Sequence, residues 1–312
     1  MPQVPADTGP ALLFTRTRVT ARDERVFIAK LAALALFTAT GAVLALRPHP
    51  LLAVTGVLLL AALYTHAVEL QHQCLHHSAF RRSSRHRLIG VPLGIPLLVV
   101  YSHYRVRHLQ HHRYLGTPQD TEFFDFDTRA PLTAGVLLRG LLDYRRLGVV
   151  IADVARSAAG RWTYAHGQLA PAMQRRIVAE HLLLGGVLSA AAVAAATGHG
   201  ETLLRLWILP LLLAVPLHFL VELPEHILCD TDTTDVLRNT RSIRGSRFST
   251  WFTNGNNMHI EHHAAMTTPI NLLSSRHEET QRYATHVERT YLDFYRLVWR
   301  AVRNPEAESV RR

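Results

Sequence analysis

The sequence is poor in cysteine, which excludes two ways of holding a protein or a metal ion together. Its 312 residues include only Cys74 and Cys229, and these form no Cys-x-x-Cys pair. Neither a disulfide framework nor a thiolate zinc site is therefore indicated, and both cysteines are expected to be packing residues. The chain also lacks a His-Glu-x-x-His motif, which is the common pattern of zinc metalloproteases.

Lysine is almost absent as well. Lys30 is the only lysine, and the formal net charge of +10 is carried almost entirely by arginine. No compact basic cluster is interleaved with aromatic residues as a nucleic-acid-binding surface requires, so no nucleic-acid partner is expected. The chain has instead 48% hydrophobic residues and a positive mean hydropathy. Both values indicate a membrane protein.

Long apolar runs predict an all-α integral membrane fold with four transmembrane helices in two hairpins. Each run approaches the ~20 residues that a bilayer span needs. The spans are expected at approximately 26–46, 51–70, 181–197 and 202–221. Such hairpins place both termini and all histidine clusters on one face. Because most arginines outside the spans belong to that face, it is predicted to be cytoplasmic, in a multi-pass protein of the cell membrane.

The segments outside the spans are predicted to form a cytoplasmic helical cap. Residues 88–101 are apolar but short for a span and contain Pro92 and Pro96, so an interfacial or re-entrant segment is expected. The chain is divided into three regions. These are a cytoplasmic N-terminal segment at 1–25 that does not resemble a cleavable signal peptide, a membrane domain at 26–275, and a cytoplasmic C-terminal helix and tail at 276–312.

Histidine, with 20 copies, is concentrated in three clusters. In the first, His72 and His76 lie one helical turn apart at the end of the second span, where two imidazoles can bind one metal ion. The other two clusters have the form His-x-x-His-His, which places positions i, i+3 and i+4 on one helix face. They are His108-x-x-His111-His112 and His259-x-x-His262-His263. Each cluster alone is weak, but together they predict a shared histidine-rich metal site.

The number of imidazoles favours two metal ions over one. A single structural zinc ion needs four ligands and usually recruits cysteine. Imidazole binds iron, zinc and copper, so the ligand type leaves the metal open. His218, Glu222 and His226 add a stripe at i, i+4 and i+8 along the last span, and Glu69 and Glu222 are expected to orient imidazoles by accepting their N–H groups. Direct ligation stays open for three further histidines: His66, His77 and His103.

The order and spacing of the clusters resemble the three histidine boxes of the integral-membrane fatty acid desaturase and hydroxylase superfamily. The flanking residues agree: Phe80 after the first box, Asp120-Thr-Glu122-Phe after the second, and Asn239-Thr-Arg241 and Asn256-Asn257 before the third. The resemblance covers roughly residues 60–275. It implies a non-haem di-iron centre with nine histidine ligands: His72, His76, His108, His111, His112, His226, His259, His262 and His263.

The same resemblance implies an O₂-dependent membrane oxidoreductase, foremost a fatty acyl desaturase acting on a lipid or acyl-chain substrate. Its cofactors would be two iron ions, with O₂ as co-substrate. No fused cytochrome b5 motif is seen, so a separate ferredoxin-type electron donor is expected. The chain departs from the family pattern after the third box, where Ala264-Ala-Met replaces a common Leu-Phe-Pro stretch, and the substrate-facing wall is expected to differ there.

Other functions fit the sequence less well. Within the superfamily, a hydroxylase or ketolase acting on an alkyl, lipid or carotenoid substrate is the nearest alternative. A metal transporter would need ionisable residues near the membrane midplane, whereas the predicted span centres are apolar. A non-catalytic metal-binding membrane protein would not require this order of boxes.

Overall fold

Two long apolar helices, α1 (Ala21–Ala45) and α2 (Pro50–Leu75), form the first hairpin. The computed structural model describes residues 9–120, 126, 128 and 130–304. A capping box between Thr20 and Asp23 begins α1, and Pro50 occupies the first position of α2, where its missing N–H costs nothing. The hairpin is tight because Gly56 of α2 lies directly against the backbone of Ala45 in α1.

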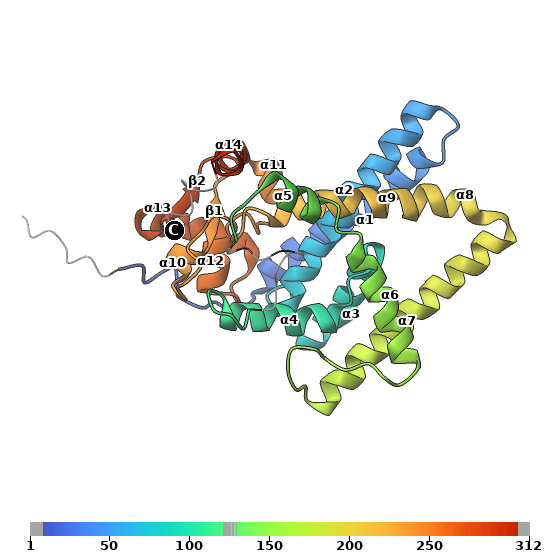
Figure 1. The fold of residues 1–312 in the computed structure, drawn as a ribbon, viewed down its shortest axis with the longest axis horizontal. Coiled ribbons are helices and arrows are strands. Elements are labelled where there is room, and N and C mark those ends of the chain that lie inside the picture. The colour runs from blue at the N-terminus through green and yellow to red at the C-terminus, as the bar shows by residue number, and fades with distance from the viewer. Residues whose placement is uncertain (1–8, 121–125, 127, 129, 305–312) are drawn as a thin grey trace, which may run out of the picture.

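A second helical run extends from Pro171 to Glu222 and is bent in the middle. It comprises α7 (Pro171–Ala194), η2 (Ala195–His199), α8 (Gly200–Leu203), η3 (Leu204–Ile208) and α9 (Leu209–Glu222). Thr197 and Gly198 have non-helical dihedral angles, with φ of 98° at Gly198. The chain reverses direction there (Figure 1), close to the turn expected at 198–201. The kink therefore separates α7 from the run formed by α8, η3 and α9.

Between these hairpins lie α3 (Ser83–Gly94), η1 (Ile95–Leu97) and α4 (Tyr101–Tyr114). The axis turns by 97° between α3–η1 and α4, and Leu98 at the break has a left-handed backbone with φ of 58°. This geometry fits the re-entrant segment expected at 88–101. It also sends α4, with the second histidine cluster, toward the end of α2.

The described residues contain three helices long and apolar enough to cross a membrane, or up to four if the bent pair is one span. Large apolar side chains are exposed on these helices, including Leu36 at 64%, Leu51 at 72% and Val193 at 63%. An apolar outer surface suits contact with lipid. The fold is mostly helical with three or four candidate membrane spans, while the arrangement of four spans in two hairpins stays a prediction.

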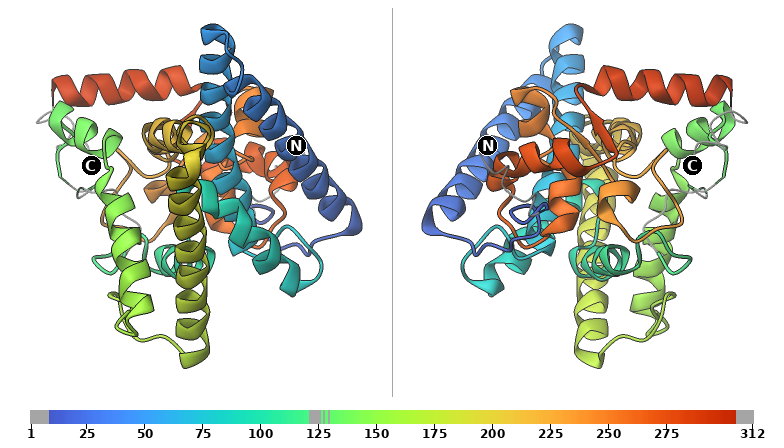
Figure 2. Two further views of the ribbon diagram at one scale, coloured as in Figure 1. Left: turned by 90° about the vertical axis from the view of Figure 1, so that its right-hand side faces the viewer. Right: turned by 90° about the vertical axis from the view of Figure 1, so that its left-hand side faces the viewer.

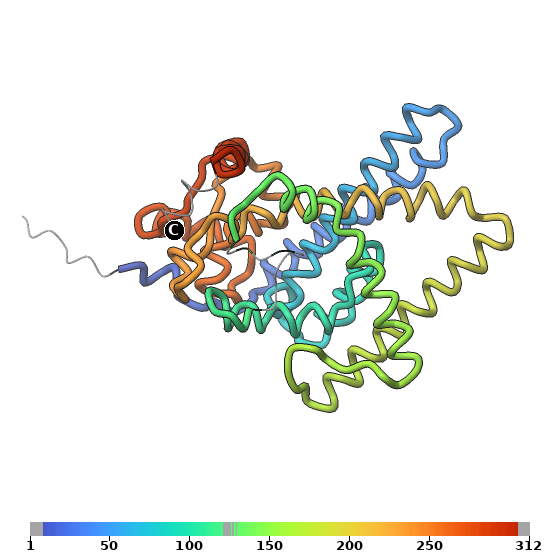
Figure 3. The backbone as a smooth tube through the Cα atoms, viewed as in Figure 1, coloured from blue at the N-terminus to red at the C-terminus, as the bar shows by residue number. Residues whose placement is uncertain are grey.

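The remaining elements gather around the ends of these helices. The amphipathic α6 packs along α7, as Figure 2 also shows. The elements are α5 (Ala134–Leu141), α6 (Arg145–Ala158), α10 (Val236–Asn239), β1 (Arg241–Ile243), α11 (Arg247–Phe252), α12 (His259–Ala264), η4 (Ile270–Arg276), α13 (His277–Tyr283), β2 (His286–Glu288) and α14 (Tyr291–Arg303). From α10 onward they occupy one end of the molecule, and the bends of both hairpins lie toward the other (Figure 3).

The predicted all-α fold did not include one observed feature, which is a short parallel ladder of β1 and β2. Ser242 pairs with Val287, and Arg241 with His286. The ladder joins the loop before the third histidine cluster to the C-terminal region. There Phe294 and Val298 of α14 pack in one apolar core with Phe219 and Leu223 at the end of α9. The C-terminal elements are thus part of the same packed unit as the histidine clusters.

We expect Gly56→Ala to destabilise the first hairpin. A Cβ atom at this position would lie 2.1 Å from the backbone N of Ala45 and 2.6 Å from the carbonyl oxygen of Gly41, and such overpacking costs about 1–3 kcal/mol. Gly186→Ala in α7 is the matched control, because nothing lies within 4 Å of its Cβ position. Thermal unfolding in detergent should show a lower transition temperature for Gly56→Ala only. Equal transitions for both variants would contradict the close packing.

Candidate metal centre

Nine histidines from four parts of the chain converge near the C-terminal ends of α2 and α9. His72 belongs to the last turn of α2 and His76 caps that helix. The second cluster belongs to α4 and the third to α12. His226 lies in the turn that follows α9. Their ring nitrogens form two compact groups: His72, His76, His108, His112 and His262 in the first, and His111, His226, His259 and His263 in the second.

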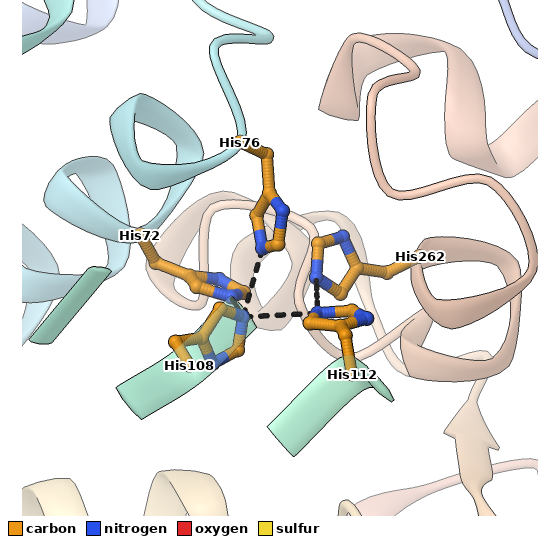
Figure 4. Close-up of side chains that lie close together, drawn as sticks. All are labelled: His72, His76, His108, His112 and His262. Atoms are coloured by element: carbon orange, nitrogen blue, oxygen red, sulfur yellow. Dashed lines mark hydrogen bonds between the residues drawn. The ribbon is translucent and has the colours of Figure 1, made fainter. Parts of the chain in front are cut away.

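In the first group, His108 holds the central position (Figure 4). Its Nε2 lies 2.7 Å from Nε2 of His72, 2.8 Å from Nε2 of His76 and 3.0 Å from Nε2 of His112. His262 completes the group, with its Nε2 3.1 Å from that of His112. Nitrogen atoms from α2, α4 and α12 therefore surround one small volume.

His226 is central in the second group. Its Nε2 lies 3.1 Å from Nε2 of both His111 and His259, and Nε2 of His263 lies 3.1 Å from that of His259. The two groups adjoin, because the rings of His112 and His263 stack with their centroids 4.0 Å apart. The arrangement offers two neighbouring positions for metal ions.

The other ring nitrogens fix the tautomer of the second group. Nδ1 of His111 lies 2.9 Å from a carboxylate oxygen of Asp120. Nδ1 of His226 lies 3.1 Å from the carbonyl oxygen of Asn239, and Nδ1 of His259 lies 3.0 Å from Oδ1 of Asn256. These oxygens can only accept, so each Nδ1 carries the proton and each Nε2 keeps a lone pair. Oriented imidazoles of this kind are typical of metal ligands.

Burial favours the uncharged form of His226, His259, His262 and His263. It lowers the pKa of His226 to about 3, reinforced by neighbouring His111. Burial also lowers the pKa values of His259, His262 and His263 well below their usual range, with nearby histidines adding to the effect. A neutral imidazole whose Nδ1–H is already donated has no proton for an Nε2–Nε2 contact. The short contact of His226 with His259 therefore juxtaposes two lone pairs, which a cation between them would stabilise.

A carboxylate adds negative charge to the same place. Oε2 of Glu225 lies 3.3 Å from Nε2 of His259, and its other oxygen accepts a hydrogen bond from the side-chain amide of Asn256. The donor set of imidazoles and one carboxylate fits a transition-metal ion such as iron, zinc or copper. Sequence reasoning did not assign Glu225 a role, because a single glutamate beside a histidine has no distinctive spacing.

In the first group, two of the histidines lack a hydrogen-bond partner for the second ring nitrogen within the described part of the chain. Nδ1 of His72 and Nδ1 of His76 are buried and have no hydrogen-bond partner among the described residues. Glu69, expected to orient an imidazole, approaches His218 instead, with 4.0 Å between Oε1 and Nε2. His218 is 3.2 Å from Glu222 and belongs to neither nitrogen group. Among the described residues, Nδ1 of His72 and Nδ1 of His76 thus lack the oxygen partners seen in the second group.

The stripe predicted at positions 218, 222 and 226 is interrupted. α9 ends at Glu222, before Pro224, because proline disfavours helical geometry in the residue before it. His226 therefore follows in a turn and reaches the second group. Arg241 holds that turn. Its buried guanidinium donates to the carbonyl oxygens of Pro224, Ile227 and Leu228 and pairs with Glu288 of β2.

The other histidines singled out in the sequence lie elsewhere. Nδ1 of His66 faces the carbonyl oxygen of Phe252 at 2.7 Å, and the ring stacks on Trp251. His77 stacks on His86. Neither belongs to the nitrogen groups, whereas His103 joins a separate cluster with Asp153 and His181.

Of the residues that flank the three histidine boxes in sequence, some pack in the core and others hold the backbone. Phe80 packs in the core around the end of α2. The side-chain amide of Asn257 donates to the carbonyl oxygen of Ile243 at 2.7 Å and so holds backbone. Glu122, which follows the second box, lies outside the described residues.

A cavity of about 670 Å³ opens beside the histidine groups. His72, His108, His111 and His226 contribute to its wall. Apolar side chains form another part of the wall: Val68, Leu97, Leu98, Val100, Leu147, Val150, Val215 and Phe219. The cavity thus combines a partly apolar wall with charged side chains, including Arg107, Arg146 and Glu222, and reaches the candidate metal centre.

Comparison with known protein families identifies a match over most of the chain. The model of the family described as "Fatty acid desaturase" matches residues 48–295, which is well over half of the chain and includes all nine histidines. The comparison with curated proteins found no match.

Asp120 provides a test of the second group. Asp120→Ala removes the acceptor of the His111 Nδ1–H, and loss of such a partner lowers metal affinity by about 10–100-fold. Asp120→Asn keeps an acceptor oxygen and should lose less affinity. Competition of the iron-loaded protein with a chelator measures the effect, and exposed Asp232→Ala is the control. Unchanged metal retention in Asp120→Ala would contradict this role.

Proposed function

Because the chain belongs to the fatty acid desaturase family, we propose that it is a di-iron membrane enzyme that introduces a double bond into a fatty acyl chain. Family membership establishes a desaturase-like oxidoreductase. The metal identity, the substrate and the reaction outcome are the proposed part. The observation that carries the proposal is the convergence of two groups of imidazole nitrogens beside an apolar cavity.

We assign the nine clustered histidines as the iron ligands, five to one ion and four to the other. The oriented Nδ1–H groups of His111, His226 and His259 support this assignment. Glu225 is placed to add a carboxylate to the second set. With two bound iron ions and O₂, such a centre supplies an oxidant strong enough to remove hydrogen atoms from an unactivated methylene group.

The overall reaction is balanced by two electrons from a donor. An acyl –CH₂–CH₂– unit, O₂, two electrons and two protons give –CH=CH– and two molecules of water. The residues of this chain bind and orient the acyl segment. Val68, Leu97 and Val215 offer an apolar wall, and excluding bulk water from this wall protects the reactive site from side reactions.

The electrons are proposed to come from a separate ferredoxin-type protein that docks on the cap. Exposed arginines favour an acidic partner by electrostatic attraction. Arg81 and Arg296 keep 60% and 61% of their side chains exposed. The catalytic domain is proposed to cover 26–275, with the segments 1–25 and 276–312 on the same cytoplasmic side. The packing of α14 against α9 supports a shared side.

The product identifies the reaction. A bacterial host that expresses this chain with a ferredoxin and its reductase should contain acyl chains with additional double bonds, located by mass spectrometry of its fatty acids. His262→Ala should lose iron and at least ~100-fold of the activity, since it removes a direct ligand instead of a supporting group. His199→Ala, at the distant exposed bend, is the matched control and should keep both.

Two outcomes would contradict this assignment. Hydroxylated or keto products would identify the hydroxylase or ketolase activity of the same superfamily. Full activity and iron content in His262→Ala would refute the ligand assignment itself.

The proposed topology can be tested with introduced cysteines, since Cys74 and Cys229 are both buried. His199→Cys lies at the bend of the second hairpin and Asp232→Cys on the cap, and both positions are exposed. A membrane-impermeant maleimide applied to intact cells should label only His199→Cys, because the cap faces the cytoplasm. Permeabilised cells should allow labelling of both. Labelling of Asp232→Cys in intact cells would contradict a cytoplasmic site.

A further inference from the structure

A separate cluster of two histidines and one aspartate lies outside the nine histidines. His103 of α4, Asp153 of α6 and His181 of α7 bring two ring nitrogens and one carboxylate oxygen within 4.8 Å of one another. Asp153 and His181 are buried, and His103 is half-buried. We propose that these three side chains form an additional binding site for a divalent transition-metal ion, separate from the candidate di-iron centre.

The site is built on three helices that hold one another in place. α6 packs along α7, and α4 also contacts α7. His103 and His108 are five residues apart on α4, which separates their directions by about 140° around the helix axis. One imidazole therefore points to the nine-histidine cluster and the other to α6 and α7.

The cluster has hydrogen-bond partners that orient its donor atoms. The hydroxyl of Ser157 lies 2.8 Å from Nδ1 of His181. When this hydroxyl accepts the Nδ1–H, Nε2 of His181 keeps its lone pair, as in metal sites with a supporting hydrogen bond. Arg156 donates to Oδ1 of Asp153 at 2.9 Å and so holds this carboxylate in place. Both partners come from α6.

The donor set suits a divalent transition-metal ion. Two imidazoles and one carboxylate bind zinc in open sites and iron(II) in other enzymes. Ligands of one such ion lie about 3–4 Å apart, and the three donor atoms here all lie within 4.8 Å of one another. Trp162 packs edge-on against the rings of His103 and His181, at 5.4 and 5.1 Å between centroids, and forms a firm wall behind them.

The three side chains of the proposed site also line the cavity beside the nine histidines. His103, Asp153 and His181 all line the same cavity that reaches His72 and His108. A water molecule, or an oxygen atom of a ligand in the cavity, could complete the coordination of an ion here. The site therefore lies at a second position along the cavity wall, apart from the nine histidines.

The test is the zinc content of the full-length protein in detergent, measured by mass spectrometry after loading with Zn²⁺ and removal of loosely bound ions. Asp153→Asn and His181→Ala should each bind one zinc ion fewer per chain than the unaltered protein. His166→Ala is the matched control, because His166 lines the same cavity but does not belong to the cluster, and its zinc content should be unchanged. Equal zinc content in all variants would overturn the proposal.

A milder variant covers the case in which the buried substitutions prevent folding. His103 is only half-buried, so His103→Gln should fold normally and still lose one ion, or bind it at least tenfold more weakly. Full retention by this variant would also overturn the proposal. The readout is a difference of one ion between variants. This difference can be measured even if the nine histidines bind no metal. Failure of the nine histidines to bind metal would instead appear as a low total zinc content per chain in the unaltered protein.

Discussion

The structure depends on one electrostatic constraint, which is that uncharged imidazoles from distant parts of the chain present lone pairs to one another. In the second group, the Nδ1–H groups of His111, His226 and His259 are already donated to oxygen atoms. The Nε2 atoms of His226 and His259 then meet without a shared proton. A buried cation would turn this unfavourable contact into coordination, and metal binding would then be thermodynamically linked to folding of this region.

The scaffold meets this constraint with rigid elements and with one irregular turn. α2, α4 and α12 each present histidines at helical spacing. His226 instead depends on the turn after α9, which is fixed by the guanidinium of Arg241. A buried arginine is favourable here because carbonyl oxygens and Glu288 satisfy its donors. The candidate centre thus joins membrane helices to the C-terminal ladder.

The parts of this site that follow from sequence are those with short-range periodicity. Spacings of three and four residues place His108, His111 and His112 on one helix, and apolar runs locate α1 and α2. Other contacts could not be predicted in this way. The pairing of His103 with Asp153 and His181, the approach of Glu225 to His259, and the β1–β2 ladder all join segments far apart in sequence, where no local pattern specifies which residues meet. The break at Pro224 had a local signal, but it was outweighed by the regular spacing of the stripe.

The link between Arg241 and Glu288 also sets an order of events during biosynthesis. The chain leaves the ribosome from its N-terminus, so the third histidine cluster is made before β2, which pairs with β1 and carries the carboxylate partner of Arg241. Until β2 has been made, the turn that carries His226 lacks that partner and the edge of β1 is unpaired. Completion of the second histidine group therefore follows the synthesis of β2, and a metal ion would be bound there only after that step.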